Sequence, residues 1–153
     1  MSYSNFEKAM MLTAQCKNYK SAGPQSEELL RKVETAYGFK LSRQHREYLK
    51  KYGYILFYGT ELYGIYDNAF KGIYAGNAIV ATLQDRKKNK LPKDWIPIYD
   101  YDDGYVAYLD YTQLNEEEEP QIIVAVYTGD EYKLIEVIAT DLGDFILSLV
   151  QQS

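Results

Sequence analysis

Residues 26–53 read SEELLRKVETAYGFKLSRQHREYLKKYG, and they have the pattern of two consecutive helices with a short connection between them. Ser26 stands before the first apolar-periodic segment, where its hydroxyl can accept a hydrogen bond from a backbone N–H of the first turn. Gly38 follows that segment and predicts its end. Ser42 and Gly53 occupy the corresponding positions around the second segment. The stretch therefore predicts a pair of adjacent helices.

A further helix is predicted before this pair. Ser4, followed by Glu7 three residues later, has the spacing of a capping box. Phe6 and Met10 share one side of a helix that begins there. We expect residues 1–22 to form a helical extension that precedes the main part of the domain.

After the helical pair, the pattern changes to the alternating and continuous apolar runs that are typical of strands. Residues 54–66 predict a tight hairpin. Residues 121–139, QIIVAVYTGDEYKLIEVIA, predict two strands that are joined at the turn residues T-G-D-E. Residues 77–89 predict a helix between these strand regions, and residues 140–151 predict a final helix with one apolar face.

Helices that come first, consecutive strands that come later and one closing helix indicate an α+β fold. We expect a single domain over residues 1–153, because the chain contains no internal repeat and no low-complexity linker. The N-terminal helices and the C-terminal helix would pack on a largely antiparallel mixed sheet.

The composition is typical of a folded protein and excludes several classes. Of the 153 residues, 46% are hydrophobic and 25% are charged, which argues against disorder. No apolar run approaches the ~20 residues that span a bilayer, and the N-terminal residues lack the cationic start and apolar block of a secretion signal. Cys16 is the only cysteine, which excludes an internal disulfide and a multi-cysteine metal site. We expect a cytoplasmic protein that has no cofactor and no contact with a membrane.

Charge is distributed unevenly along the chain. Residues 1–93 contain 16 Lys and Arg against 8 Asp and Glu, whereas residues 94–153 contain 14 Asp and Glu against Lys133 alone. An acidic C-terminal part repels the phosphates of nucleic acids and attracts a basic partner. The alternative interpretation is a solvated acidic surface that keeps the protein soluble. We expect no nucleic-acid binding.

Four aspartates lie among five tyrosines in residues 99–112, YDYDDGYVAYLDYT. A calcium loop that began at Asp100 would need glycine at its sixth position and glutamate at its twelfth. Tyr105 and Tyr111 stand there instead. A transition-metal site would favour histidine, and the chain contains His45 alone. The sequence therefore predicts no metal site.

The same stretch offers one arrangement for acid–base catalysis. Asp102 and Asp103 stand beside a glycine, which is typical of a turn. Asp100 and Asp110 lie on the two arms of that turn and could approach each other across a hairpin, so a small carboxylate-dependent hydrolase stays open as an alternative. His45 has charged neighbours on its helix and is expected at the surface. No nucleophile or cofactor motif is present, and we assign no catalytic residue.

We interpret residues 99–112 as a hairpin whose arms present tyrosine hydroxyls beside carboxylates on one solvated face. Tyrosine offers apolar area and a hydroxyl group at a low cost in side-chain entropy, and contact surfaces are enriched in it. Other acidic residues that are expected in loops join this contact surface. The candidate partner-binding residues are Asp100, Asp102, Asp103, Tyr105, Glu116, Glu117, Glu118, Glu119, Asp130 and Glu131. The acidic run at residues 116–119 fits a solvated loop equally well.

The order of these motifs resembles the SUKH superfamily. Residues 26–53 are similar to its opening pattern of a capped helix, a glycine and a second helix that ends in glycine. ELYGI at residues 61–65, KLPKDWIPIYDYDDGYVAYLDYT at residues 90–112 and the final DFILSL helix follow in the family's order. The resemblance covers residues 26–153. Ser42 stands where the family commonly has proline, and both residues suit the start of a helix.

The resemblance implies an α+β domain without known catalysis and a common bacterial role as an immunity protein. Such a protein binds and neutralises a cognate secreted toxin, often a nuclease or another enzyme that acts on nucleic acid. On this basis we expect the acidic, tyrosine-rich surface to bind the toxin. A regulatory scaffold of the same fold, which binds endogenous proteins, is the alternative from another class. Nothing in the sequence indicates an oligomeric state.

Overall fold

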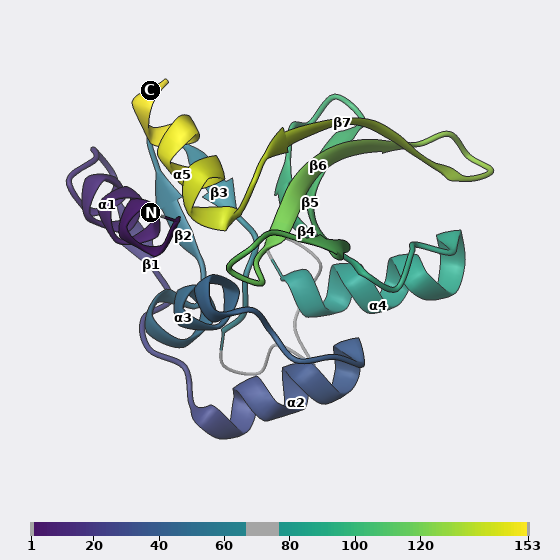
Figure 1. Cartoon of the computed structure of the whole chain (residues 1–153), viewed down its shortest axis with the longest axis horizontal. Helices are drawn as coiled ribbons and strands as arrows, with labels where there is room; N and C mark the ends of the chain where they lie inside the picture. The colour runs from purple at the N-terminus through teal and green to yellow at the C-terminus, as the bar shows by residue number, and fades with distance from the viewer. Residues whose placement is uncertain (1, 67–76, 153) are drawn as a thin grey trace.

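The computed structural model describes residues 2–66 and 77–152 (Figure 1). The helices are α1 (Ser2–Ala14), α2 (Glu27–Tyr37), α3 (Arg43–Tyr52), α4 (Ala78–Asn89) and α5 (Leu142–Gln151). The strands are β1 (Lys20–Ser21), β2 (Ile55–Phe57), β3 (Thr60–Leu62), β4 (Trp95–Asp100), β5 (Tyr105–Leu114), β6 (Pro120–Tyr127) and β7 (Tyr132–Ala139). The α+β class is confirmed. In the described residues, none of the helices combines the length and the apolar character that are needed to cross a membrane.

The predicted helical pair is confirmed, and the predicted residues set its ends. The Ser26 hydroxyl oxygen accepts a hydrogen bond from the Leu29 N–H at 3.1 Å, and Gly38 ends α2 with φ +93°. Ser42 Oγ accepts from the His45 N–H at 3.4 Å at the start of α3. Each serine satisfies an N–H group that has no partner within its helix, so local sequence determines where both helices begin.

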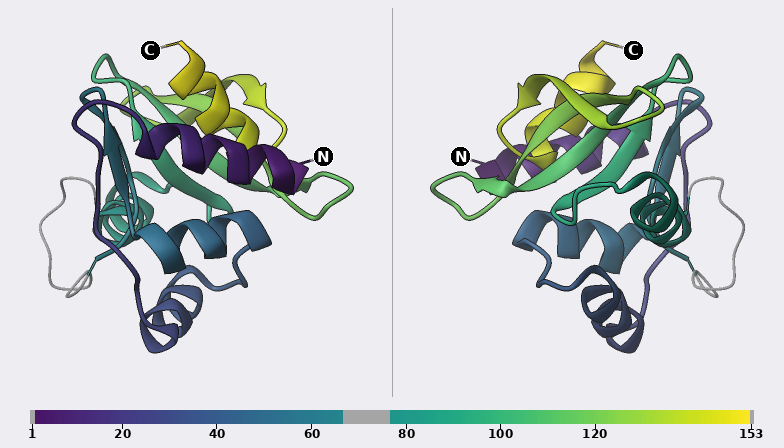
Figure 2. Two further views of the ribbon diagram at one scale, coloured as in Figure 1. Left: turned by 90° about the vertical axis from the view of Figure 1, so that its left-hand side faces the viewer. Right: turned by 90° about the vertical axis from the view of Figure 1, so that its right-hand side faces the viewer.

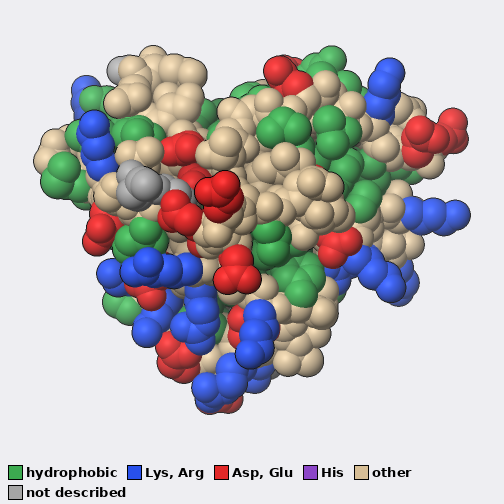
Figure 3. Space-filling model, in the orientation of Figure 1, with side chains coloured by type: hydrophobic (Ala, Val, Ile, Leu, Met, Phe, Trp, Pro, Cys, Tyr) green, Lys and Arg blue, Asp and Glu red, His purple; other side chains and the backbone are tan. Residues whose placement is uncertain are grey.

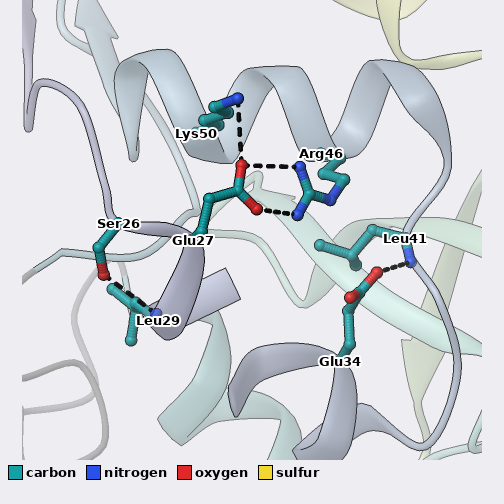
Figure 4. Close-up of polar contacts among 7 residues, drawn as sticks. All are labelled: Ser26, Glu27, Leu29, Glu34, Leu41, Arg46 and Lys50. Atoms are coloured by element: carbon teal, nitrogen blue, oxygen red, sulfur yellow. Dashed lines mark hydrogen bonds and ion pairs between the residues drawn. The ribbon is translucent and has the colours of Figure 1, made fainter. Parts of the chain in front are cut away.

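A cluster of charged side chains joins α2 to α3 (Figure 4). The Glu27 carboxylate accepts hydrogen bonds from both Nη atoms of Arg46 and forms an ion pair with Lys50 Nζ at 3.1 Å. These two cations, Arg46 first, lower the pKa of Glu27 to about 2. Further along, the Glu34 carboxylate accepts a hydrogen bond from the Leu41 N–H at 2.8 Å. The two helices are therefore held together at the start of α2, and Glu34 near the end of α2 fixes the connection at Leu41.

The N-terminal helix belongs to the packed core. α1 starts at Ser2, so Ser4 lies inside the helix, and the prediction of Ser4 as its N-cap is wrong. Phe6 and Met10, predicted on its inner face, are buried. The two views of Figure 2 show α1 lying along α5. Gly143 of α5 permits this approach, because a Cβ atom there would lie 2.7 Å from the Cα atom of Phe6.

The strands form two antiparallel sheets. The smaller sheet has the order β1-β2-β3, and the larger sheet has the order β4-β5-β6-β7. A backbone hydrogen bond of 2.8 Å from the Tyr63 N–H to the Ile98 carbonyl oxygen connects them. The hairpins predicted at residues 54–66 and 121–139 are confirmed as β2 with β3 and as β6 with β7, and the hairpin predicted at residues 99–112 is formed by β4 with β5.

Both faces of the larger sheet are covered at its centre. Side chains alternate along β5, so Ala107 and Leu109 join the main core, whereas Tyr108 packs with Trp95 and Leu91 on the opposite face. The expectation that one face of this hairpin is solvated is therefore wrong. Tyrosines in the middle of the hairpin pack within the protein, and the exposed side chains of this hairpin lie near its ends.

Candidate functional site

The candidate partner-binding residues lie at turns on opposite ends of the larger sheet (Figure 1). The β4–β5 and β6–β7 turns leave one end, whereas the β5–β6 turn leaves the other end. β5 has 10 residues, which corresponds to roughly 30 Å between these ends. The predicted residues therefore do not form one continuous surface.

The hairpin-tip residues, at the first end, use part of their acidic groups to fold the turns. Asp100 Oδ1 accepts a hydrogen bond from the Asp102 N–H at 2.8 Å, and Asp103 Oδ1 accepts one from the Tyr105 N–H at 3.0 Å. Asp102 adopts a left-handed backbone with φ +63°, so the D-D-G turn is confirmed. The hairpin-tip residues are Asp100, Asp102, Asp103, Tyr105, Asp130 and Glu131.

Asp100 and Asp110 do not meet. Asp100 pairs with Val106 at the tip of the hairpin, whereas Asp110 pairs with Trp95, four residues further along β5 and roughly 13 Å away. Asp110 is buried, and its Oδ1 atom accepts a hydrogen bond from the Thr112 N–H at 3.0 Å. The carboxylate pair on which the hydrolase alternative depended is therefore absent between these two residues.

Asn115 shapes the β5–β6 turn at the other end. Its Oδ1 atom accepts hydrogen bonds from the N–H groups of Glu117 at 2.8 Å and Glu119 at 3.1 Å. Its Nδ2 atom donates to the Thr140 carbonyl oxygen at 3.2 Å, just before α5. Residues 116–118 are exposed. The turn thus presents carboxylates from a backbone that is tied to the start of α5.

Glu119, one of the predicted site residues, is buried. Its side chain is 2% exposed, and its Oε2 atom accepts a hydrogen bond from the Gln44 N–H at 3.2 Å in the first turn of α3. Burial raises the pKa of Glu119. The expected loop exposure of Glu119 is wrong, because its carboxylate lies at the start of α3, where the helix dipole favours a negative charge.

Glu116 and Glu117 border a hollow of about 350 Å³ in the protein surface. Its walls come from the β5–β6 turn, from α1 and from the start of α5. In Figure 3, acidic side chains gather on this face, where the turn approaches α5. We call it the acidic hollow, and it is lined by Asn5, Asn115, Glu116, Glu117, Thr140, Asp141 and Asp144.

Asp141 and Asp144 are residues of this site that the sequence analysis missed. Asp141 caps α5, because its Oδ1 atom accepts a hydrogen bond from the Asp144 N–H at 2.9 Å. Asp144 accepts hydrogen bonds from Asn5 Nδ2 at 2.9 Å and from Thr140 Oγ1 at 2.7 Å. The pattern T-D-L-G-D before an apolar run is a recognisable helix start. Its place beside the β5–β6 turn depends on tertiary structure.

The acidic hollow has the chemistry of a receptor for a positively charged side chain. Hydrogen bonds hold Asp144 and Asn115 in place, so acceptor atoms are positioned before a partner arrives. Across residues 2–66 and 77–152, no group of three His, Cys, Asp or Glu side chains could hold a metal ion. A guanidinium or ammonium group is a cation that suits these carboxylates.

His45 is a core residue, and its expected surface position is wrong. Its side chain is 3% exposed. It shares one face of α3 with Tyr48 and Leu49, which are also buried, at spacings of three and four residues. That spacing was visible in the sequence, but the charged residues on either side of His45 obscured it. A buried imidazole on this face supports packing and does not belong to an exposed site.

Comparison with known proteins supports the resemblance. A family model of the SUKH superfamily, described as SMI1-KNR4 cell-wall, matches residues 27–146. The match begins at the start of α2 and includes the larger sheet, the β5–β6 turn and the first part of α5. No curated protein matches the chain in a sequence search. Because the family model covers most of the chain, the chain belongs to the SUKH superfamily.

Proposed function

We propose that this chain is a bacterial immunity protein that binds a cognate toxin in the cytoplasm and neutralises it through the acidic hollow. The SUKH family supports a role in binding another protein. The observation that carries the proposal is the exposed pair Glu116 and Glu117, which borders an open hollow together with Asp144, while Asp141 of the same lining is buried. The proposal assigns no catalytic residue.

An acidic contact site suits a toxin that acts on nucleic acid. Such an enzyme commonly has basic residues near its substrate, because it must attract phosphates. An acidic inhibitor would occupy those basic residues and compete with the phosphates for them. The acidic excess of residues 94–153 would also accelerate the encounter of the two proteins.

The acidic hollow is the stronger candidate of the two ends of the sheet. It is concave, and its carboxylates come from two elements that are distant in sequence. Glu116 and Glu117 at its rim are exposed, whereas the carboxylates of Asp141 and Asp144 take part in hydrogen bonds at the start of α5. A cationic side chain at the hollow could contact the exposed carboxylates of Glu116 and Glu117, with the negative charge of Asp144 nearby, which favours a charge-assisted contact.

Co-expression with the protein that a neighbouring toxin gene encodes tests this proposal. The variant E116K/E117K reverses two charges at the hollow, and D130K/E131K makes the same change in charge at the exposed β6–β7 turn. We expect the wild type and D130K/E131K to protect cells from the toxin, and E116K/E117K to lose protection. Protection by E116K/E117K would discard the hollow as the contact site. Death of cells that carry the folded wild-type protein would discard the immunity role against that toxin.

A regulatory scaffold that binds endogenous proteins is the second candidate function. The description of the matched family, SMI1-KNR4 cell-wall, is the observation that favours it. The two candidates differ in their genome neighbourhood, because an adjacent toxin gene is expected only for an immunity protein. A chain that binds endogenous proteins and no neighbouring gene product would support the scaffold.

A further inference from the structure

A pocket of about 720 Å³ lies where α2 and α4 end, and it shares no residue with the acidic hollow. Its walls come from residues 37–39 at the end of α2, from Arg86 of α4 and from residues 90–94 between α4 and β4. Both helices end on the same side of the molecule (Figure 1). Sites for small molecules commonly have volumes of roughly 300–1,000 Å³. The pocket is therefore large enough to admit a small ligand.

Positive charge dominates this pocket. Arg86, Lys90 and Lys93 supply three positive charges to its lining and Asp94 supplies one negative charge, so their formal sum is +2. Across residues 2–66 and 77–152, the ion pairs involve other cations, namely Lys32, Arg46, Lys50 and Lys51. In Figure 3, Lys and Arg side chains gather beside α4. The pocket thus has an excess of positive charge in a protein whose net charge is −5.

Arg86 is held in place without a carboxylate partner among the described residues. Its Nη1 atom donates to the Ala36 carbonyl oxygen at 3.3 Å, and its Nη2 atom donates to the Lys93 carbonyl oxygen at 2.7 Å. Both acceptors are neutral, so they fix the guanidinium group without neutralising it. Its Nε atom is buried and has no hydrogen-bond partner in the described part of the chain. Burial lowers the pKa of Arg86, because a desolvated cation is disfavoured, and a bound anion would offset that cost.

Lys90 occupies a backbone conformation that favours glycine. It is the C-cap residue of α4, with φ +60° in the left-handed region, and its N–H donates a hydrogen bond to the Asp85 carbonyl oxygen. Glycine is the common residue at such a helix end, because a Cβ atom is strained there. A lysine in this position therefore needs a reason other than backbone geometry. Its place in the wall of a positively charged pocket supplies one.

Apolar side chains form much of the remaining lining. Tyr37 and Leu91 are buried, and Pro92 is half-buried. Phe39 is also half-buried, and its ring packs on that of Tyr111 with 4.5 Å between the centroids. Small-molecule sites typically combine such apolar walls with a few polar groups that fix the orientation of the ligand. The lining thus suits a ligand that has both an anionic group and an apolar body.

We propose that this pocket binds a phosphate monoester with a small apolar body, such as an aromatic ring. A phosphate monoester carries a charge of about −1.5 to −2 at pH 7, which matches the formal charge of the lining. A carboxylate carries one negative charge and would leave part of the positive charge uncompensated. Lys90 and Lys93 would contact the phosphate oxygens, and Arg86 would stabilise the negative charge from its fixed position.

Calorimetric titration of the purified chain with phenyl phosphate tests the proposal. We expect phenyl phosphate to bind at least about tenfold more tightly than inorganic phosphate, because only the ester has a ring to place against the apolar wall. Benzoate has a ring and a single negative charge, and it should also bind at least about tenfold more weakly than phenyl phosphate. A chain that does not bind phenyl phosphate at millimolar concentration, or that binds benzoate or inorganic phosphate equally well, would overturn the proposal.

A pair of double variants tests the lysines of the pocket. K90Q/K93Q removes two cations from the lining and should weaken the binding of phenyl phosphate at least about tenfold. K8Q/K133Q is the matched control, because it removes the same charge at exposed positions outside the pocket and should keep wild-type affinity. Far-UV circular dichroism establishes that both variants are folded. Wild-type affinity in folded K90Q/K93Q, or an equal loss in both variants, would contradict this site.

The single variant K90G separates ligand binding from the stability of the fold. Glycine relieves the left-handed backbone at this position, so K90G should melt at a temperature no lower than that of the wild type. It should nevertheless bind phenyl phosphate more weakly, because one cation of the lining is lost. A lower melting temperature together with unchanged binding would show that Lys90 serves the fold alone.

A peptide that contains phosphotyrosine distinguishes two sources of this chemistry, with the unphosphorylated peptide as its control. Binding at least about tenfold tighter than that of phenyl phosphate would identify a phosphorylated protein as the source. Equal or weaker binding would identify a free phosphate ester. Binding of the unphosphorylated peptide with the same affinity would contradict recognition of the phosphate group.

Discussion

The Nδ1 atom of His45 lies 2.7 Å from the hydroxyl oxygen of Tyr111, and this contact joins α3 to β5. Burial lowers the pKa of His45 to about 3, so its imidazole is neutral at physiological pH. The Tyr111 hydroxyl oxygen also accepts a hydrogen bond from the Ser42 N–H at 3.1 Å. The start of α3 is therefore attached to the larger sheet by neutral polar groups.

Acid should weaken the wild-type protein more than the variant H45Q. The unfolded histidine takes up a proton near its ordinary pKa of 6.5, whereas the folded one does so only near 3. Between these values the unfolded state binds more protons, so this residue lowers the free energy of unfolding by up to about 1.4 kcal/mol per pH unit as pH falls. Urea unfolding at a series of pH values measures this slope. A difference between wild type and H45Q that stays constant from about pH 7 to about pH 4 would contradict a buried neutral imidazole.

Glu119 should behave in the opposite direction. Burial raises its pKa, because the charged form is disfavoured in the folded state. The residue therefore adds stability below its ordinary pKa of 4.5, and this stability is lost as pH rises through the pKa of the folded state. E119Q keeps an acceptor for the Gln44 N–H and should be at least as stable as the wild type at neutral pH. E119A leaves that N–H without its partner and should cost about 1–3 kcal/mol. Urea unfolding at neutral pH measures the stability of both variants. Equal stabilities of E119A and E119Q would rule out this buried hydrogen bond.

Gly143→Ala should destabilise the protein, because the added Cβ atom would lie 2.7 Å from the backbone of Phe6 and push α1 away from α5. The expected loss is about 1–3 kcal/mol in the free energy of unfolding. Ser148→Ala, at an exposed position of the same helix, is the matched control and should change stability little. Thermal unfolding compares the two variants. A Gly143→Ala protein as stable as the control would show that α1 can shift without cost.

Glu27→Gln should loosen the contact between α2 and α3 in a salt-dependent way. Glu27 binds Arg46 and Lys50 of the neighbouring helix, whereas Glu28 forms its ion pair with Lys32 of its own helix. At low ionic strength we expect E27Q to melt at a lower temperature than E28Q, and the difference should shrink as salt screens the charges. Melting curves at two salt concentrations measure this. Equal melting temperatures at low salt would mean that the cluster does not hold the two helices together.

The parts of the fold that depend on local sequence were predictable. Ser26 and Ser42 mark the starts of α2 and α3, because a hydroxyl at an N-cap satisfies backbone groups only two or three residues away. The turns at residues 101–104 and 128–131 carry the aspartate and glycine residues that such backbones need. The acidic loop exposure of residues 116–118 was also anticipated.

The Ser4 error concerns a local helix start, whereas the errors at the candidate site concern polar side chains whose partners are distant in sequence. Glu119 meets Gln44 across 75 residues, His45 meets Tyr111 across 66 residues, and Asp144 meets Asn5 across 139 residues. The charged neighbours of Glu119 and of His45 in the sequence suggest exposure. Only the packed fold shows that the Glu119 carboxylate and the His45 imidazole are buried. The acidic residues predicted as one surface lie at two ends of the sheet, because successive turns of an antiparallel sheet lie at alternate ends.

Calorimetric titration of the purified neighbouring toxin with three forms of the protein tests the contact at the acidic hollow most directly. The forms are the wild type, E116K/E117K and the matched control D130K/E131K, all at one ionic strength. We predict that E116K/E117K binds at least about a hundredfold more weakly than the wild type, and that the control stays within about threefold of it. Wild-type affinity in E116K/E117K, or an equal loss in both variants, would contradict a contact at the hollow.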